Sequence, residues 1–138
     1  MVVQTPPDDM IPLESQFGEL VKLRGYALDL TQAAPNGLIA VTLYWEALSS
    51  FQDNFQSFVH LHDGTTMHGQ SDGAPECDIN PTTRWEPGQL VPDTHFVPIS
   101  ADVPIDQPIP ILIGMYNLIT LERLADPLRL DDVILTTP

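Results

Sequence analysis

Two short histidine patterns contain the residues of this chain best suited to binding a metal ion. His60 and His62 stand two positions apart in an apolar and aromatic run, and Asp93 and His95 repeat that spacing further along. Residues two apart in a β-strand point to the same face of the sheet. Imidazole nitrogens and carboxylate oxygens are common ligands of zinc and other divalent ions. One hypothesis is a divalent-metal site built from these four side chains. The alternative is that the histidines, which share their face with Phe58, are hydrogen-bonded groups at a sheet surface or core edge.

A second candidate site lies in the proline-bounded segment 81–88, where Arg84 precedes Trp85. An indole can stack on a sugar ring, and a guanidinium can donate hydrogen bonds to the ring's hydroxyls. Asp72 and Asp93 are acids that could pair with Arg84, and they complete this candidate ligand-binding set. The alternative is that Trp85 closes one end of the fold while Arg84 forms an ion pair.

A third candidate site gathers three carboxylates in a turn-rich stretch: Asp72, Glu76 and Asp78. Oxygen ligands in a loop suit calcium, although their spacing does not match the twelve-residue EF-hand loop. The alternative is a solvated acidic loop. No cofactor is required by the sequence, and calcium or another divalent ion is the kind of metal these residues would accept.

Motifs of known catalytic machinery are missing from the sequence. There is no G-x-S-x-G elbow, no H-E-x-x-H pair and no glycine-rich phosphate loop. Paired carboxylates for glycoside hydrolysis cannot be identified from spacing among 19 acidic residues. The sequence therefore favours a protein that is not an enzyme.

Charge and length limit the partners and the architecture. With 19 acidic and five basic side chains, the formal net charge of -14 opposes binding to nucleic acid. The chain has 138 residues, a length typical of one domain, and its single cysteine, Cys77, cannot form an internal disulfide. No segment has the pattern of a secretory signal or reaches the roughly 18 apolar residues that span a bilayer. We therefore expect no membrane insertion by this chain itself.

The elements that must position these side chains are predicted to be strands. Short apolar and alternating runs are closed every ten or so residues by Gly, Pro, Asn or Asp. The predicted strands cover 20–30, 38–48, 55–63, 65–70, 90–99, 109–116 and 133–137. This spacing predicts an all-β fold: a single antiparallel β-sandwich of about seven strands, either immunoglobulin-like or a jelly roll.

Local signals add detail to this prediction. A shift in alternation near Gly25 indicates a bulge, and the run 38–48, which contains Trp45, looks like a central strand with Trp45 in the core. Residues 1–17, rich in proline, are predicted to be an extended lead-in or linker before a domain covering 18–138. A helix over 118–130 is disfavoured because Pro127 interrupts it.

Several segments also resemble a known family. In order they are Leu23-Arg24-Gly25-Tyr26, Val41-Thr42-Leu43-Tyr44-Trp45-Glu46-Ala47-Leu48, Phe58-Val59-His60-Leu61, Gln70-Ser71-Asp72-Gly73, Pro81-Thr82-Thr83-Arg84-Trp85-Glu86-Pro87-Gly88, Gly114-Met115-Tyr116 and Glu122-Arg123-Leu124. Together, over roughly residues 17–135, they resemble a soluble β-sandwich domain at the C-terminal end of predicted bacterial membrane glycosyltransferases of the protein mannosyltransferase-like class. That domain has no known activity or ligand to carry over. The resemblance implies an accessory module on the extracytoplasmic face of a membrane, with any transferase activity belonging to a neighbour.

Three functional hypotheses follow from these observations. The first is a non-catalytic accessory domain that binds glycan or glycolipid through Trp85 and Arg84. The second is a structural or protein-docking module whose partner is a protein subunit of a larger assembly. The third is a divalent-metal-binding domain built on the two histidine patterns.

Overall fold

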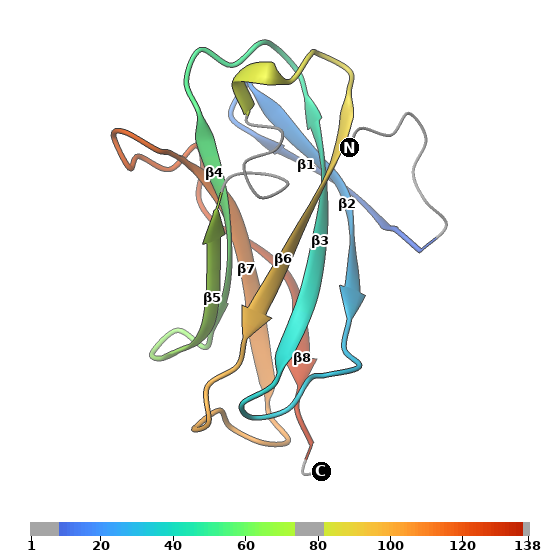
Figure 1. The fold of residues 1–138 in the computed structure, drawn as a ribbon, viewed down its shortest axis with the longest axis vertical. Coiled ribbons are helices and arrows are strands. Elements are labelled where there is room, and N and C mark those ends of the chain that lie inside the picture. Colours follow the sequence, from blue (N-terminus) through green and yellow to red (C-terminus); the bar gives the residue numbers. More distant parts are fainter. Residues whose placement is uncertain (1–8, 74–81, 137–138) are drawn as a thin grey trace.

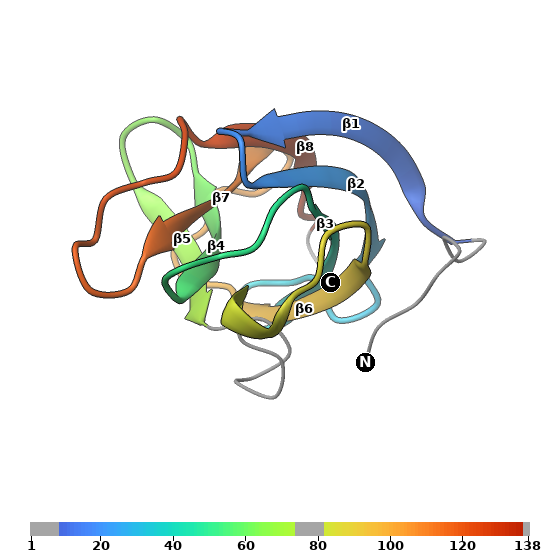
Figure 2. The same cartoon turned by 90° about the horizontal axis from the view of Figure 1, so that it is seen from above.

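Two four-stranded antiparallel sheets face each other in the computed structural model, which describes residues 9–73 and 82–136 (Figures 1 and 2). The strands are β1 (Ile11–Phe17), β2 (Val21–Asp29), β3 (Leu38–Ala47), β4 (Phe55–His62), β5 (Met67–Gly73), β6 (Leu90–Pro98), β7 (Pro108–Asn117) and β8 (Leu128–Ile134). The strand order is β1-β2-β3-β6 in the first sheet and β5-β4-β7-β8 in the second. The predicted all-β sandwich is therefore confirmed.

Consecutive strands explain much of this topology. β1, β2 and β3 form a meander, and β4–β5 and β7–β8 are hairpins within the other sheet. The chain crosses between sheets after β3, β5 and β6.

The core lies between the sheets because alternate residues of the strands are apolar. β3 buries Val41, Leu43 and Trp45 on its inner face, and β7 buries Ile111 and Ile113. Trp45 is fully buried and lies edge-on to Phe17, with ring centroids 5.4 Å apart. The predicted role of Trp45 in the core and the central position of the run 38–48 are both confirmed.

The bulge predicted near Gly25 is also confirmed, because the pairing of β2 with β3 shifts between Leu23 and Gly25. The backbone of β1 passes close to Gly25, and a Cβ added there would lie 2.7 Å from the carbonyl oxygen of Ile11. A larger residue at this position would push β1 away from the sheet.

Two sequence expectations need correction. The segment 1–17, predicted to be a lead-in, contains β1, which pairs with β2 and buries Phe17. The sandwich therefore begins at Ile11 rather than at residue 18, and the described residues form eight strands rather than about seven. Pro12 is tolerated because β1 is an edge strand whose register shifts between Pro12 and Ser15.

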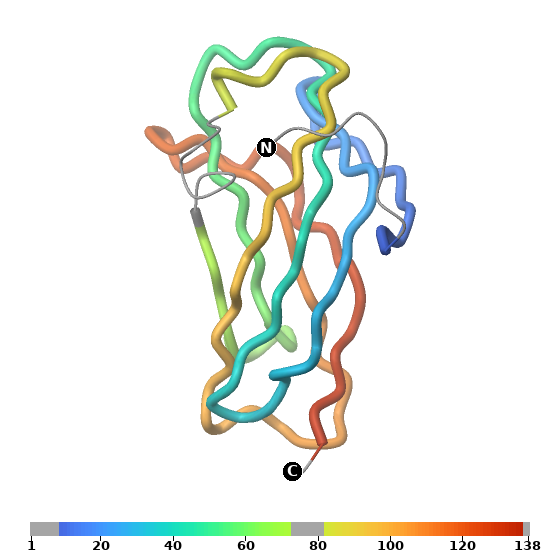
Figure 3. Tube along the Cα trace, turned by 45° about the vertical axis from the view of Figure 1, so that its right-hand side comes forward, coloured from blue at the N-terminus to red at the C-terminus, as the bar shows by residue number. Residues whose placement is uncertain are grey.

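The segment 118–127 is a loop that projects from the second sheet between β7 and β8, best seen in Figures 1 and 3. The predicted absence of a helix over 118–130 is confirmed, because β8 begins at Leu128. No helix in the described part of the chain is long and apolar enough to cross a membrane.

Candidate functional site

The outer face of the second sheet carries the most developed candidate site. Inward and outward residues alternate along β4, so Val59 and Leu61 enter the core while Phe58 and His60 face outward. On β5, Asp72 is directly opposite Phe58 and shares its face. On β7, Gly114 is opposite Phe58 on the other side.

Phe58 forms the floor of this site. A Cβ on Gly114 would lie 2.6 Å from the tip of the Phe58 ring, so the ring lies flat over a position without a side chain. Phe58 is only 2% exposed although it points away from the core. Its ring is covered by polar neighbours, with the His60 ring centroid 4.7 Å away and the Arg123 guanidinium carbon 5.4 Å from its centroid.

Polar groups surround this aromatic floor. His60 Nε2 lies 3.1 Å from Asp72 Oδ1. The Tyr116 hydroxyl donates to Gln56 Oε1 at 2.7 Å. Partial burial, followed by the nearby Asp72 carboxylate, raises the pKa of Tyr116 above its usual value, so the phenol stays protonated at neutral pH.

These side chains enclose a hollow of about 290 Å³. We call it the outer-face groove, and its lining residues are Phe58, His60, Asp72, Tyr116, Leu121 and Arg123. An adjoining hollow of about 270 Å³ shares Phe58, His60 and Arg123 and extends toward His62. A concave site with an apolar floor and a few convergent polar groups is typical of small-ligand binding.

The β7–β8 loop supplies one wall of the groove. Its base is closed by hydrogen bonds from Asn117 N to Glu122 O at 2.8 Å and from Leu124 N to Met115 O at 2.9 Å. Arg123 consequently pairs with Tyr116 as an isolated β-bridge. This pairing places the Arg123 guanidinium over the Phe58 ring on the outer face of the sheet.

Leu121 in this loop has an unusual backbone. Its φ is +64°, in the left-handed region that bulky side chains rarely adopt, and its side chain is 67% exposed. The turn is held by Asn117, whose Oδ1 accepts from the backbone N–H groups of Ile119 and Thr120. Strained, exposed leucines bring little stability to a fold, and such positions often belong to binding sites.

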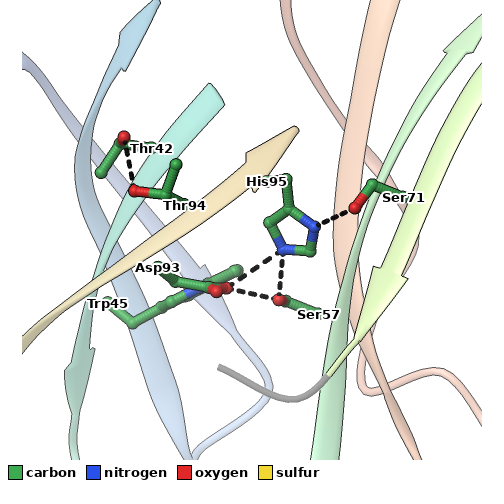
Figure 4. Close-up of polar contacts among 7 residues, drawn as sticks. All are labelled: Thr42, Trp45, Ser57, Ser71, Asp93, Thr94 and His95. Atoms are coloured by element: carbon green, nitrogen blue, oxygen red, sulfur yellow. Dashed lines mark hydrogen bonds and ion pairs between the residues drawn. The ribbon is translucent and has the colours of Figure 1, made fainter. Parts of the chain in front are cut away.

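A second polar cluster lies between the sheets and has a different character (Figure 4). The Asp93 carboxylate accepts from Trp45 Nε1 at 3.1 Å and from the Ser57 hydroxyl, and His95 Nε2 lies 3.3 Å from it. The other ring nitrogen of His95 lies 2.9 Å from Ser71 Oγ. Ser57 is fully buried, and its hydroxyl donates to Asp93 and lies 2.7 Å from His95 Nε2. The cluster joins the two sheets through hydrogen bonds.

The predicted four-residue metal site is not assembled, which corrects that hypothesis. His60 and His62 lie on the outer face of β4, whereas Asp93 and His95 point from β6 into the sandwich. The β4 strand itself separates the two pairs. Within residues 9–73 and 82–136, no group of three or more histidine, cysteine or acidic side chains is arranged to hold a metal ion.

Trp85 and Arg84 do not form a stacking platform. Trp85 is 2% exposed and lies edge-on to Phe51, with ring centroids 5.7 Å apart, near the end of the sandwich. The indole has no open face on which a sugar ring could stack, which corrects the prediction for this residue. Arg84 is exposed, Asp72 lies in the outer-face groove and Asp93 lies in the interior, so this set does not converge.

Of the three acids proposed for calcium, Asp72 pairs with His60 in the groove. Glu76 and Asp78 lie outside the described residues. Sequence reasoning did not select Phe58, Tyr116, Leu121 or Arg123 as site residues. The sequence did contain a signal for Phe58, because it stands at the same two-residue spacing as His60 and His62 and therefore shares their face of the strand.

Comparisons with known proteins give no further assignment. The chain matches no protein-family model, and a search of curated proteins finds no significant match.

Proposed function

We propose that this domain is a non-catalytic module that binds a glycan in the outer-face groove. The observation that carries the proposal is the convergence of Asp72, His60 and Arg123 around the covered Phe58 ring. These groups come from β4, β5 and the β7–β8 loop, so they meet only in the folded chain.

The chemistry of the groove suits a sugar. Each sugar hydroxyl can both donate and accept, and a carboxylate such as Asp72 can accept from neighbouring hydroxyls. The guanidinium of Arg123 offers donors, and the hydroxyl oxygen of Tyr116, whose proton is donated to Gln56, can accept. Leu121 adds an apolar surface at the rim for the C–H groups of a sugar ring.

The family resemblance is consistent with this location. Four of the segments that carry it contribute to the groove: those containing Phe58 and His60, Asp72, Tyr116, and Arg123. As part of the same proposal, the domain acts as an accessory module of a glycan-transfer system on the outer face of a membrane. The glycan or the head group of a glycolipid would be its ligand.

A second candidate function is docking to a protein subunit. It is supported by the uncharged tip of the β7–β8 loop, where Ile119 is 84% exposed beside Leu118 and Leu121. Exposed apolar side chains that cluster in this way often mark contact surfaces. Crosslinking from a photoreactive residue at position 119 in native membranes would identify such a partner.

The glycan proposal is tested by replacing Asp72 with asparagine. Screening on a glycan array is expected to find saturable binding by the wild-type domain, and Asp72→Asn is expected to weaken it by about tenfold or more, because a charged acceptor is lost. Asp102→Asn is the matched control, since Asp102 is exposed and lies outside the groove. Absence of glycan binding by the folded wild-type domain would contradict the proposal.

Leu121 provides a separate prediction. Leu121→Asn should leave the free energy of unfolding unchanged or raise it by about 1 kcal/mol, since asparagine tolerates the left-handed backbone. The same change should weaken glycan binding, because the apolar rim is lost. Denaturant unfolding and binding titrations measure the two effects.

Leu118→Asn is the control for Leu121, because it alters an exposed leucine of the same loop that does not line the groove. A marked loss of stability in Leu121→Asn, with unchanged binding, would show that Leu121 serves the fold instead.

A further inference from the structure

Arg123 differs from most basic residues of this acidic chain in its ion pairing. Lys22 lies 3.1 Å from Glu14 Oε2, Arg24 Nη1 lies 2.7 Å from Glu46 Oε1, and Arg129 Nη2 lies 2.8 Å from Asp132 Oδ2. No carboxylate of the described residues forms an ion pair with Arg123. The remaining cation, Arg84, is exposed on the short 3-10 turn Thr82–Arg84, which does not line the groove.

The guanidinium of Arg123 is nevertheless fixed in place. Its backbone is held by the bridge to Tyr116, and its guanidinium carbon lies 5.4 Å from the centroid of the Phe58 ring. A cation over an aromatic face is attracted by the ring and keeps its N–H donors available at its edge. Arg123 thus presents a planar fork of donors to the groove, and no carboxylate within residues 9–73 and 82–136 forms an ion pair with it.

Asp72 and Arg123 approach Phe58 from opposite sides. Asp72 comes from β5, on one side of β4, and Arg123 comes from the loop after β7, on the other side. The groove therefore has an accepting end, where Asp72 pairs with His60, and a donating end at Arg123. Hydroxyl groups can donate to the accepting end, and an anionic acceptor makes the stronger hydrogen bonds to the guanidinium at the donating end.

The net charge of the chain limits how an anionic ligand could bind near Arg123. With a formal charge of -14, the protein as a whole repels anions, so an anionic ligand must gain its affinity from a local contact. Planar, bidentate hydrogen bonding to a carboxylate or phosphate is the contact that an arginine fork makes best.

We propose that the groove selects an acidic glycan, a sugar bearing a carboxylate or a phosphate ester, with that anionic group on Arg123 and the hydroxyls near Asp72 and His60. This inference rests on the proposed glycan-binding function and names the class of ligand. Arg123 is its specificity-determining residue.

The test compares three versions of one oligosaccharide: neutral, carrying a uronic acid carboxylate, and carrying a phosphate ester. The wild-type domain is expected to bind at least one acidic version about tenfold or more tightly than the neutral version, since charged hydrogen bonds are stronger than neutral ones. The acidic version that binds more tightly identifies the anionic group that the groove prefers. The preference should weaken as salt concentration rises.

Arg123→Gln should abolish this preference by weakening the binding of the acidic sugar far more than the binding of the neutral sugar, and Arg84→Gln should leave the preference intact. Arg123 and Arg84 are both exposed. Near-ultraviolet circular dichroism is the check that each variant is folded. Equal binding of neutral and acidic sugars, or an acidic preference that survives in Arg123→Gln, would overturn this inference and leave the glycan proposal standing. Failure of all three sugars to bind would overturn both.

Discussion

Asp93→Ala is expected to lower the free energy of unfolding by about 3–5 kcal/mol, the largest effect of any single change considered for this protein. The Asp93 carboxylate accepts from Trp45 Nε1 and the Ser57 hydroxyl, and it faces His95 Nε2. All four residues are at most 4% exposed. Removing the acceptor would leave the buried Trp45 Nε1 donor without its partner, which costs more than the net value of a hydrogen bond.

Urea unfolding followed by tryptophan fluorescence measures this loss. Asp102→Ala is the control, because Asp102 is exposed, and it should change the free energy by less than about 0.5 kcal/mol. If Asp93→Ala were as stable as this control, the interior cluster would not join the sheets in the way its geometry indicates.

Phe58→Ala is expected to cost about 3 kcal/mol and to remove the floor of the groove. The ring is 2% exposed, lies over Gly114 and supports the guanidinium of Arg123. Its loss would open a gap over the second sheet and release Arg123. Both the unfolding free energy and the glycan affinity should therefore fall.

Phe96→Ala makes the same chemical change at a position that is 62% exposed, on the outer face of the first sheet. It should alter the unfolding free energy by less than about 1 kcal/mol and leave glycan binding intact. Equal stability losses in the two variants would mean that Phe58 is not buried beneath the groove.

The strand pattern was largely predictable because burial alternates along each strand. The run containing Val41, Leu43 and Trp45 carries this signal clearly, and it forms the central β3. Strand β1 was missed because Pro12 and the polar residues around it give little local preference for a strand. It forms because β2, the next strand along the chain, offers a free edge, and the pattern of a single segment does not show which strand it pairs with.

The candidate site was predictable only in part. His60 was selected for a divalent-metal site, and Asp72 for a calcium site and for the ligand-binding set around Trp85. The pairing of β4 with β5 that joins His60 and Asp72 is not visible in the sequence. Asp93 and His95 share the alternation of buried Val91 and Val97, a sign that they point into the core. Arg123 reaches the groove through a turn that depends on the positive φ of Leu121.

The most direct test of the central claim is a nuclear magnetic resonance titration of the ¹⁵N-labelled domain with the tightest-binding glycan from the array. The account predicts chemical-shift changes centred on the amides of residues 58–60, 70–72 and 114–123, which surround the outer-face groove. Changes centred instead on residues 82–85, around Arg84 and Trp85, would contradict it. So would a titration that leaves the amides surrounding the groove unchanged.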